Sequence, residues 1–222
     1  MNRNQVGILQ QQAVLATNKV LRNTYLLLGL SFIFSSLMAY LSFATDARPM
    51  NFVMFLVGVY GLMFLTSALK DSPLGILAVF GFTGFLGYSL GPILNIYMMQ
   101  YVNGAKIIAT AMGGTGIIFF GLSGYVLTSR KDFNYLSGFL FIATMTAFLM
   151  GLGAVFLQMP AMYLLSSALF ILVSSGVILF QTSEIIHGGE TNYIIATVIL
   201  FSQIYNLFLS LLNILSAFSN RD

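Results

Sequence analysis

The chain has no cysteine, a single histidine and very little charge. Without cysteine it can have no disulfide framework, no thiolate nucleophile and no cysteine-ligated metal site. Charged residues make up 7% of its 222 residues, whereas an ordinary soluble domain is about 25% charged. Because 58% of the residues are hydrophobic and the mean hydropathy is +0.92, such a chain could not cover a water-facing surface. The composition therefore predicts an integral membrane protein that is surrounded by the lipid bilayer.

The net charge of +3 comes from nine lysine and arginine residues against six acidic residues. These basic residues do not form a cluster of the density that nucleic-acid binding requires. We therefore expect no nucleic-acid partner, and we interpret the excess of positive charge as a signal of membrane orientation.

Seven apolar blocks are long enough to cross the hydrocarbon core, which takes roughly 20 helical residues. They predict an all-α fold, a bundle of seven transmembrane helices joined by short connections. The predicted spans are 23–43, 51–69, 74–98, 106–128, 135–158, 162–181 and 193–218. This division gives an N-terminal tail at 1–22, a transmembrane domain at 23–218 and a short C-terminal tail at 219–222.

Lysine and arginine are distributed unequally between the two sides of the seven predicted spans. The side with the N-terminus holds Arg3, Lys19, Arg22, Lys70, Arg130 and Lys131, and the opposite side holds Arg48, Lys106 and Arg221. Because basic residues are enriched on the cytoplasmic side, this count predicts a cytoplasmic N-terminus and a C-terminus on the opposite side.

Glycine is concentrated inside two of the spans. Gly81, Gly84, Gly87 and Gly91 recur at helical spacing in the third span, and Gly113, Gly114, Gly116, Gly121 and Gly124 crowd the fourth. Small residues on one face let helices approach closely in lipid, so we expect close helix packing along both spans. Pro92 follows Gly91 and removes a backbone donor, so the third span should kink or end there.

The last span carries a polar stripe of Gln203, Asn206, Ser210 and Asn213, spaced three, four and three residues apart. This spacing places the four side chains on one helix face. Because these groups would be costly against lipid, that face must look into the bundle, and the helix should lie near its centre. The stripe could form hydrogen bonds between helices, or it could line a hydrated path for an ion.

The stretch from Gln181 to Glu190 concentrates the rare polar chemistry of the chain, with Glu184, His187 and Glu190. Ionisable residues at the edge of an apolar block are functional candidates. A di-metal site of the Glu-x-x-His type needs a second such pair, and a single histidine cannot supply one. The stretch could also be a solvated turn that ends the sixth helix at glycine. We find no enzyme signature, so we expect no catalytic residues, no metal and no cofactor.

Several stretches resemble the Bax inhibitor-1 family, and within it the bacterial YccA-like branch. They are residues 17–25, 81–95 (GFTGFLGYSLGPILN), 121–133 and 174–197, the last of which contains the HGGE motif. The resemblance implies a multi-pass protein of the bacterial inner membrane in which the other six helices surround the last. It also implies an inhibitor and substrate of FtsH, a membrane-anchored AAA protease, which would engage the N-terminal tail.

Other members of this family resemble calcium or proton leak channels that are gated by two acidic side chains. The matching positions here are Gln181 and Gln203, so both carboxylates are missing. Calcium prefers several oxygen ligands with negative charge among them, and glutamine does not titrate. Glu184 follows Gln181 by one turn and could replace one carboxylate, but no residue of the seventh span replaces the other.

Two hypotheses follow. The first is a non-enzymatic modulator of FtsH, with the N-terminal tail as the segment that the protease engages. The alternative is a calcium or proton leak channel, lined by the polar stripe from Gln203 to Asn213 and with Glu184, His187 and Glu190 at its cytoplasmic mouth. Histidine changes charge near neutral pH, so such a leak should vary with pH through His187.

Overall fold

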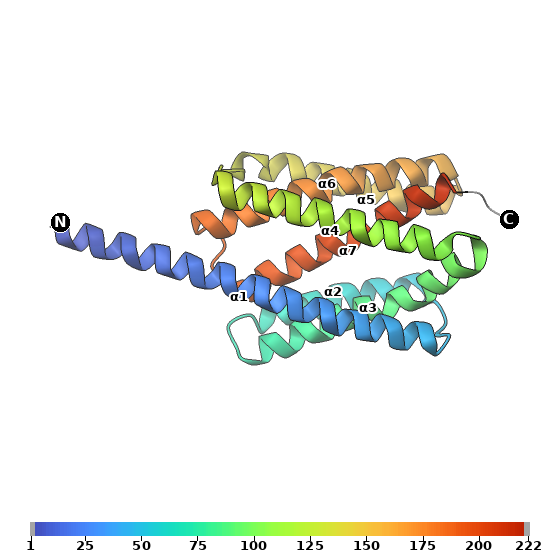
Figure 1. Ribbon diagram of the computed structural model, residues 1–222, viewed down its shortest axis with the longest axis horizontal. Coiled ribbons are helices and arrows are strands. Elements are labelled where there is room, and N and C mark those ends of the chain that lie inside the picture. The colour runs from blue at the N-terminus through green and yellow to red at the C-terminus, as the bar shows by residue number, and fades with distance from the viewer. Residues whose placement is uncertain (1–2, 220–222) are drawn as a thin grey trace.

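The computed structural model describes the backbone of residues 3–219 and the side chains from Leu15 onwards. Within this part the chain forms seven α-helices and one short 3-10 helix (Figure 1). They are α1 Arg3–Ala44, α2 Phe52–Ala68, α3 Leu74–Gln100, α4 Gly104–Ser129, η1 Asn134–Leu136, α5 Ser137–Leu157, α6 Pro160–His187 and α7 Tyr193–Ala217. The predicted all-α bundle of seven helices is confirmed.

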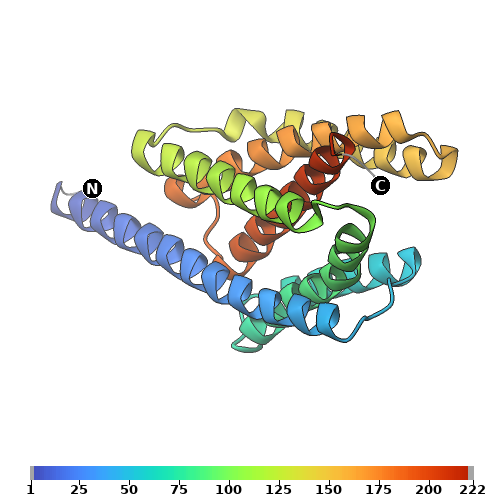
Figure 2. The ribbon, with the colours of Figure 1, turned by 45° about the vertical axis from the view of Figure 1, so that its right-hand side comes forward.

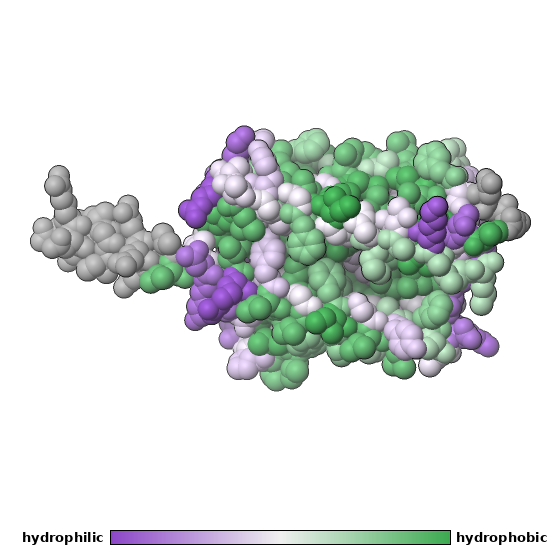
Figure 3. Space-filling view, viewed as in Figure 1, coloured by the Kyte–Doolittle hydropathy of each residue, from purple (hydrophilic) through white to green (hydrophobic). Residues whose placement is uncertain are grey.

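Six of the helices are long and apolar enough to cross a membrane, and α2 is a shorter apolar helix of 17 residues. At 1.5 Å per residue, α2 spans about 26 Å, slightly less than a typical hydrocarbon core. On the face seen in Figure 3, hydrophobic residues cover the middle of the bundle and hydrophilic residues gather towards its two ends. This distribution is what a bilayer requires of a multi-pass protein.

Two helices are longer than the spans predicted within them. The predicted first span 23–43 lies inside α1, which begins at Arg3 and takes in nearly all of the predicted tail 1–22. The predicted sixth span 162–181 lies inside α6, which continues to His187. It ends where Gly188 adopts φ 79° and its N–H turns back to the carbonyl oxygens of Glu184 and Ile185, an αL helix end for which glycine is suited. Arg221 and most of the predicted C-terminal tail 219–222 lie outside the described residues.

The last helix occupies the centre of the bundle, as predicted. Figures 1 and 2 show α7 passing between α1, α2 and α3 on one side and α4, α5 and α6 on the other. Residues on every side of α7 are buried, among them Leu200, Leu207 and Leu212. The expected ring of six neighbours has one exception: α5 packs on the outer side of α6 and makes no backbone approach to α7.

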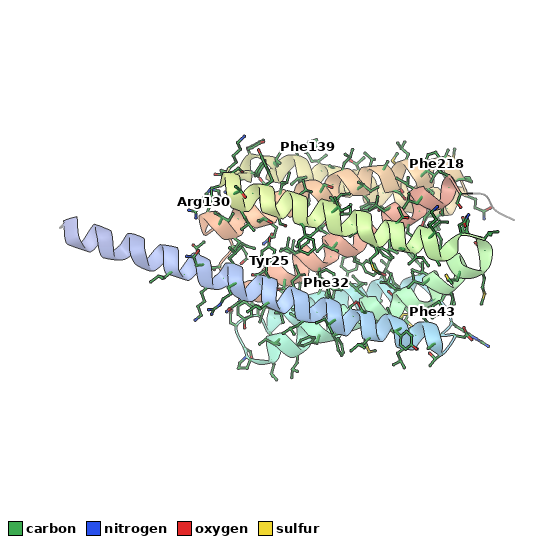
Figure 4. The ribbon with its side chains drawn as sticks, in the orientation of Figure 1. Tyr25, Phe32, Phe43, Arg130, Phe139 and Phe218 are labelled. Atoms are coloured by element: carbon green, nitrogen blue, oxygen red, sulfur yellow. The ribbon has the colours of Figure 1, made fainter. Side chains whose placement is uncertain are left out.

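Aromatic side chains join α1 to the centre of the bundle. The ring of Phe32 lies 5.1 Å from the ring of Phe201 on α7, and the ring of Tyr25 lies 6.1 Å from that of Phe119 on α4 (centroid distances). Figure 4 labels Tyr25 and Phe32 on this part of α1. Aromatic pairs at such distances add attraction beyond the area they bury, so they hold α1 against the core.

The glycines of α3 allow α1 to pack closely against it. A methyl group on Gly87 would overlap the carbonyl oxygen of Ser35, and one on Gly91 would overlap the side chain of Ser42. The expected close packing is therefore present along this face of α3. The helix continues through Pro92 to Gln100, so the third span does not end at the proline; a kink there stays a prediction.

The glycines of α4 behave differently. A methyl group on Gly113, Gly116, Gly121 or Gly124 would meet no atom of a neighbouring element within 4 Å among the described residues, and one on Gly114 would meet only Leu211, at 3.5 Å. These residues therefore do not bring α4 close to another helix of the bundle. The expectation of close packing along the fourth span is wrong for four of its five glycines.

Candidate functional site

The candidate residues fall into two groups. The first lies at the N-side end of the bundle, which we define by the connections 69–73, 130–133 and 188–192 (left side of Figure 1). The second follows α7 through the bundle towards the C-side end, defined by the connections 45–51, 101–103 and 158–159.

At the N-side end, the last turns of α6 bind the connection between α4 and η1. The hydroxyl of Ser183 donates to the carbonyl oxygen of Lys131 (3.3 Å) and accepts from the N–H of Phe133 (3.0 Å). The ring of His187 lies between two backbone carbonyls, with Nδ1 2.9 Å from the oxygen of Ser183 and Nε2 3.2 Å from that of Arg130, and the tautomer decides which nitrogen donates. The only histidine therefore lies where the end of α6 meets the end of α4.

The side chains of the two acidic residues of this stretch also contact the nearby backbone. A carboxylate oxygen of Glu190 accepts from the N–H of Asn192 at 2.7 Å. The carboxylate of Glu184 lies beside Gly189, where a methyl group would overlap it. Glu184, His187 and Glu190 thus belong to the end of α6 and the turn that follows. In the described part of the chain, three or more potential metal ligands gather at no point.

The turn after α6 is also joined to the connection between α2 and α3. The side-chain oxygen of Asn192 accepts from the N–H groups of Ile194 (3.0 Å) and Ile195 (3.3 Å), so Asn192 caps the start of α7. Its amide nitrogen donates to the carbonyl oxygen of Lys70 and to a carboxylate oxygen of Asp71, both at 3.1 Å. The hydrogen bonds of Ser183, His187 and Asn192 connect all three N-side connections.

The two glutamines at the family's gate positions lie at different depths. Gln181 is six residues before the end of α6 and Gln203 is ten residues after the start of α7, or about 9 Å and 15 Å along their helices. Gln181 is buried, and its amide nitrogen has no hydrogen-bond partner in the described structure. Gln203 is half-buried. No hydrogen bond joins the two amides in this part of the chain.

The residues of the polar stripe of α7 have different surroundings. The amide nitrogen of Asn213 donates to the hydroxyl of Ser167 on α6 at 2.7 Å, so this residue forms the expected bond between helices. Asn206 and Ser210 instead line a cavity, and no hydrogen bond from their side chains is present among the described residues. The prediction that the stripe faces the bundle agrees with these positions.

The cavity has a volume of about 480 Å³ and is partly open. Its lining comes from α2, α3, α5, α6 and α7 and reaches Pro49 and Met50 at the C-side end. We call it the α2–α5 cavity, because α2 and α5 form its opposite walls. Sequence reasoning missed one part of its lining, the hydrogen bond between Ser89 and Tyr205 (2.8 Å), because the spacing of residues within one helix does not show which residue of another helix it meets.

The first part of α1 extends beyond the bundle on the N side (Figure 1). Leu15 is 63% exposed, and among the side chains that the structure describes, Val20 and Leu21 are the first of α1 that pack against the core. From Arg3 to Val20 the helix covers about 26 Å at 1.5 Å per residue. A helical segment therefore precedes this packing.

Comparisons with known proteins agree with this architecture. The sequence pattern of the family described as "Inhibitor of apoptosis-promoting Bax1" matches residues 17–220. The chain is 51% identical over 211 residues to the "Modulator of FtsH protease YccA" of Escherichia coli strain K12, which covers 95% of this chain and 94% of that protein. It is 49% identical to an uncharacterized protein of Pasteurella multocida over 96% of both chains, and 41% identical to an uncharacterized membrane protein of Vibrio cholerae over 95% of both.

Proposed function

The chain belongs to the Bax inhibitor-1 family, described as inhibitors of apoptosis-promoting Bax1, and from this membership we propose that it is a non-enzymatic modulator of the FtsH protease. The observation that carries the proposal is the 51% identity to the "Modulator of FtsH protease YccA", which extends over 95% of this chain. A relative of the same identity is named "Inner membrane protein YccA". We therefore place the protein in the inner membrane of a bacterium.

We propose that the N-side end is cytoplasmic. Two basic residues, Lys19 and Arg22, lie in α1 on either side of the point where its packing against the core begins. Three others, Lys70, Arg130 and Lys131, lie in the connections on this side. Arg48 and Lys106 lie on the C side. Because basic residues are enriched on the cytoplasmic side of a membrane protein, this distribution supports a cytoplasmic N-terminus and a periplasmic C-terminus.

The first part of α1 is the segment that we propose FtsH engages. A protease that pulls on a membrane protein needs a segment that can leave the fold without unfolding it. Residues 15–19 meet this requirement, because the described packing of α1 against the core begins at Val20. The bundle that follows would resist extraction, and a protease held by such a substrate is unavailable to others. The protein would in this way be both substrate and inhibitor.

In this mechanism, the packing of α1 against α3 resists extraction of the protein by the protease. Pulling from the N-terminus removes α1 first, and α1 packs more extensively against α3 than any other two helices pack together. Its rings also contact α7 and α4. Removing α1 must separate these contacts before any other helix can follow.

The test is deletion of residues 2–16, which leaves every described core contact of α1 in place. The half-life of the variant is measured in cells with active FtsH and in matched cells without it, together with the abundance of another FtsH substrate. We expect the deletion to abolish FtsH-dependent turnover and to remove the protection of the second substrate. A matched variant replaces residues 2–16 by a glycine–serine segment of equal length, which separates the need for length from the need for these residues. Unchanged turnover and protection after the deletion would refute the proposal.

The leak-channel alternative has no comparable support. The helix α7 contains no acidic residue, and Glu184, His187 and Glu190 bind the local backbone or lie against it. A leak therefore stays a prediction, and calcium or proton flux into vesicles that contain the purified protein is its test.

A further inference from the structure

The floor of the α2–α5 cavity, formed by Tyr205, Asn206 and Ser210, presents polar groups that the protein pairs incompletely. The hydroxyls of Ser89 and Tyr205 lie 2.8 Å apart, and either of them can donate this hydrogen bond. In both cases the tyrosine oxygen keeps a lone pair that can accept. One turn further along α7, Ser210 is 6% exposed, and its hydroxyl makes no hydrogen bond among the described residues. Asn206 adds an unpartnered amide between them.

Polar groups left unpaired in the hydrocarbon region are costly, so this floor requires a partner. Water alone fits the floor but not the remaining space. A cavity of about 480 Å³ has the volume of on the order of fifteen water molecules, each of which needs two to four polar partners. The walls are mainly apolar and include Phe148, Leu152 and Leu209. A molecule that combines a small polar group with an apolar body matches both the polar floor and the apolar walls of the cavity.

The charge of the lining decides the chemical class of that polar group. No residue that lines the cavity is charged. A carboxylate, phosphate or ammonium group would therefore be buried without a counter-charge, which is far more costly than burying a neutral group. Tyr205 offers an acceptor, whereas Asn206 offers both a donor and an acceptor. A hydroxyl group can satisfy both at once, because it donates one hydrogen bond and accepts others.

The route into the cavity leads from the lipid. Its walls on α2 and α5 do not meet, since these two helices approach each other nowhere in the described structure. They lie below and above α7 in the view of Figure 1. Phe52 on α2 and Val155 on α5 belong to the lining and are 49% and 58% exposed. Both residues lie near the C-side ends of their helices, so the cavity opens between α2 and α5 close to this end of the bundle. A molecule that lies in the bilayer at this depth can enter between the two helices.

We propose that the α2–α5 cavity binds an uncharged lipophilic alcohol from the bilayer, with its hydroxyl group on Tyr205, Asn206 and Ser210 and its hydrocarbon body against α2 and α5. Its volume lies within the range of small-molecule sites, about 300–1,000 Å³. The proposal is independent of FtsH and adds a ligand site to the protein.

The test uses the full-length protein in phosphatidylcholine nanodiscs and two photoreactive probes, a dodecanol analogue and the matched dodecane analogue without the hydroxyl group. Labelled positions are mapped by peptide mass spectrometry. We expect the alcohol probe to label peptides of α5, α6 and α7 that line the cavity, roughly tenfold more than the hydrocarbon probe does. An excess of unlabelled dodecanol should compete with this labelling.

Three variants and one control identify the site. Asn206→Leu and Ser210→Ala remove polar groups of the floor and should lower labelling by the alcohol probe to the level of the hydrocarbon probe. Gly151→Leu fills the cavity beside Ser166, from which a methyl group at position 151 would be 3.7 Å away, and should lower labelling by both probes. Gly138→Leu makes the same change on α5 at a point with no neighbour within 4 Å and should label as the wild type.

Three results would overturn the proposal. The first is equal labelling of the cavity by the two probes. The second is labelling that persists in the Asn206→Leu and Gly151→Leu variants, provided that these variants are folded and elute from a size-exclusion column as the wild type does. The third is the absence of cavity labelling by either probe. The last result would indicate a cavity that holds water only.

Discussion

Replacing Gly87 by alanine should loosen the contact between α3 and α1. The added methyl group would overlap the carbonyl oxygen of Ser35, which belongs to the backbone of α1 and cannot rotate away. The two helices must therefore separate locally. Overpacking of this kind costs about 1–3 kcal/mol, whereas alanine in place of glycine inside a helix gains up to about 1 kcal/mol. We expect the free energy of unfolding to fall by about 1–2 kcal/mol.

Two other glycines of the same helix serve as graded controls. A methyl group on Gly81 would lie 3.9 Å from Leu62, an ordinary contact, so Gly81→Ala should leave stability unchanged or raise it by up to about 1 kcal/mol. A methyl group on Gly84 would meet the ring of Phe34 at 2.5 Å. This ring is 36% exposed and can move, so the effect of Gly84→Ala should lie between the other two.

The assay is unfolding by sodium dodecyl sulfate in mixed micelles, followed by circular dichroism, with the midpoint and slope compared among the three variants. The expected order of stability is Gly81→Ala, then Gly84→Ala, then Gly87→Ala. If Gly87→Ala is as stable as Gly81→Ala, the close approach of α1 and α3 at Ser35 is refuted, and with it the explanation of why glycine is needed there.

Three further outcomes can be measured directly. A double-mutant cycle of Asn213→Ala and Ser167→Ala should give a coupling of about 0.6 kcal/mol and no more than about 1.7 kcal/mol, and zero coupling would contradict the 2.7 Å bond. Asn192→Ala should cost about 0.5–2 kcal/mol through loss of the cap of α7 and speed amide exchange in its first turn, whereas unchanged exchange would exclude a capping role. Because the chain has no cysteine, an impermeant maleimide applied to spheroplasts should label Asn103→Cys and not Thr191→Cys, and the reverse pattern would invert the orientation.

The number of helices was predictable because the thickness of the bilayer imposes a length on each span. The end of α6 at glycine was one interpretation of the stretch from Gln181 to Glu190, whereas hydropathy alone falls at Gln181, before the helix ends at His187. Two polar residues of this last part, Ser183 and His187, contact the connection that follows α4 without ending the helix. A helix end depends on the backbone conformation of the residue after it, here Gly188, and hydropathy does not report this conformation.

The glycines show a second limit of sequence patterns. Spacing identifies a helix face that is made of small residues, but it does not say whether another helix lies on that face. Gly87 meets α1 closely, whereas Gly113 and Gly124 meet no neighbouring element within 4 Å in the described structure. The polar stripe of α7 has the same limit. Its inward direction followed from the cost of exposing amides to lipid, but the partner of Asn213 and the cavity beside Asn206 depend on helices distant in sequence.

The contact between α1 and α3 affects function as well as stability, because α1 is the first helix that a protease pulling from the N-terminus removes. The central helix α7 is the last to be reached by a protease that pulls from the N-terminus, so only its contacts with α1 oppose the first step of extraction. That step is opposed by the contacts of α1, among which the approach at Gly87 is one of the closest. A change there should shorten the time for which the protein occupies FtsH while leaving the first part of α1 intact. Gly87→Ala should therefore be degraded faster and protect a second substrate less, whereas deletion of residues 2–16 should stop degradation. The opposite effects of these two changes on turnover distinguish resistance to extraction from engagement by the protease.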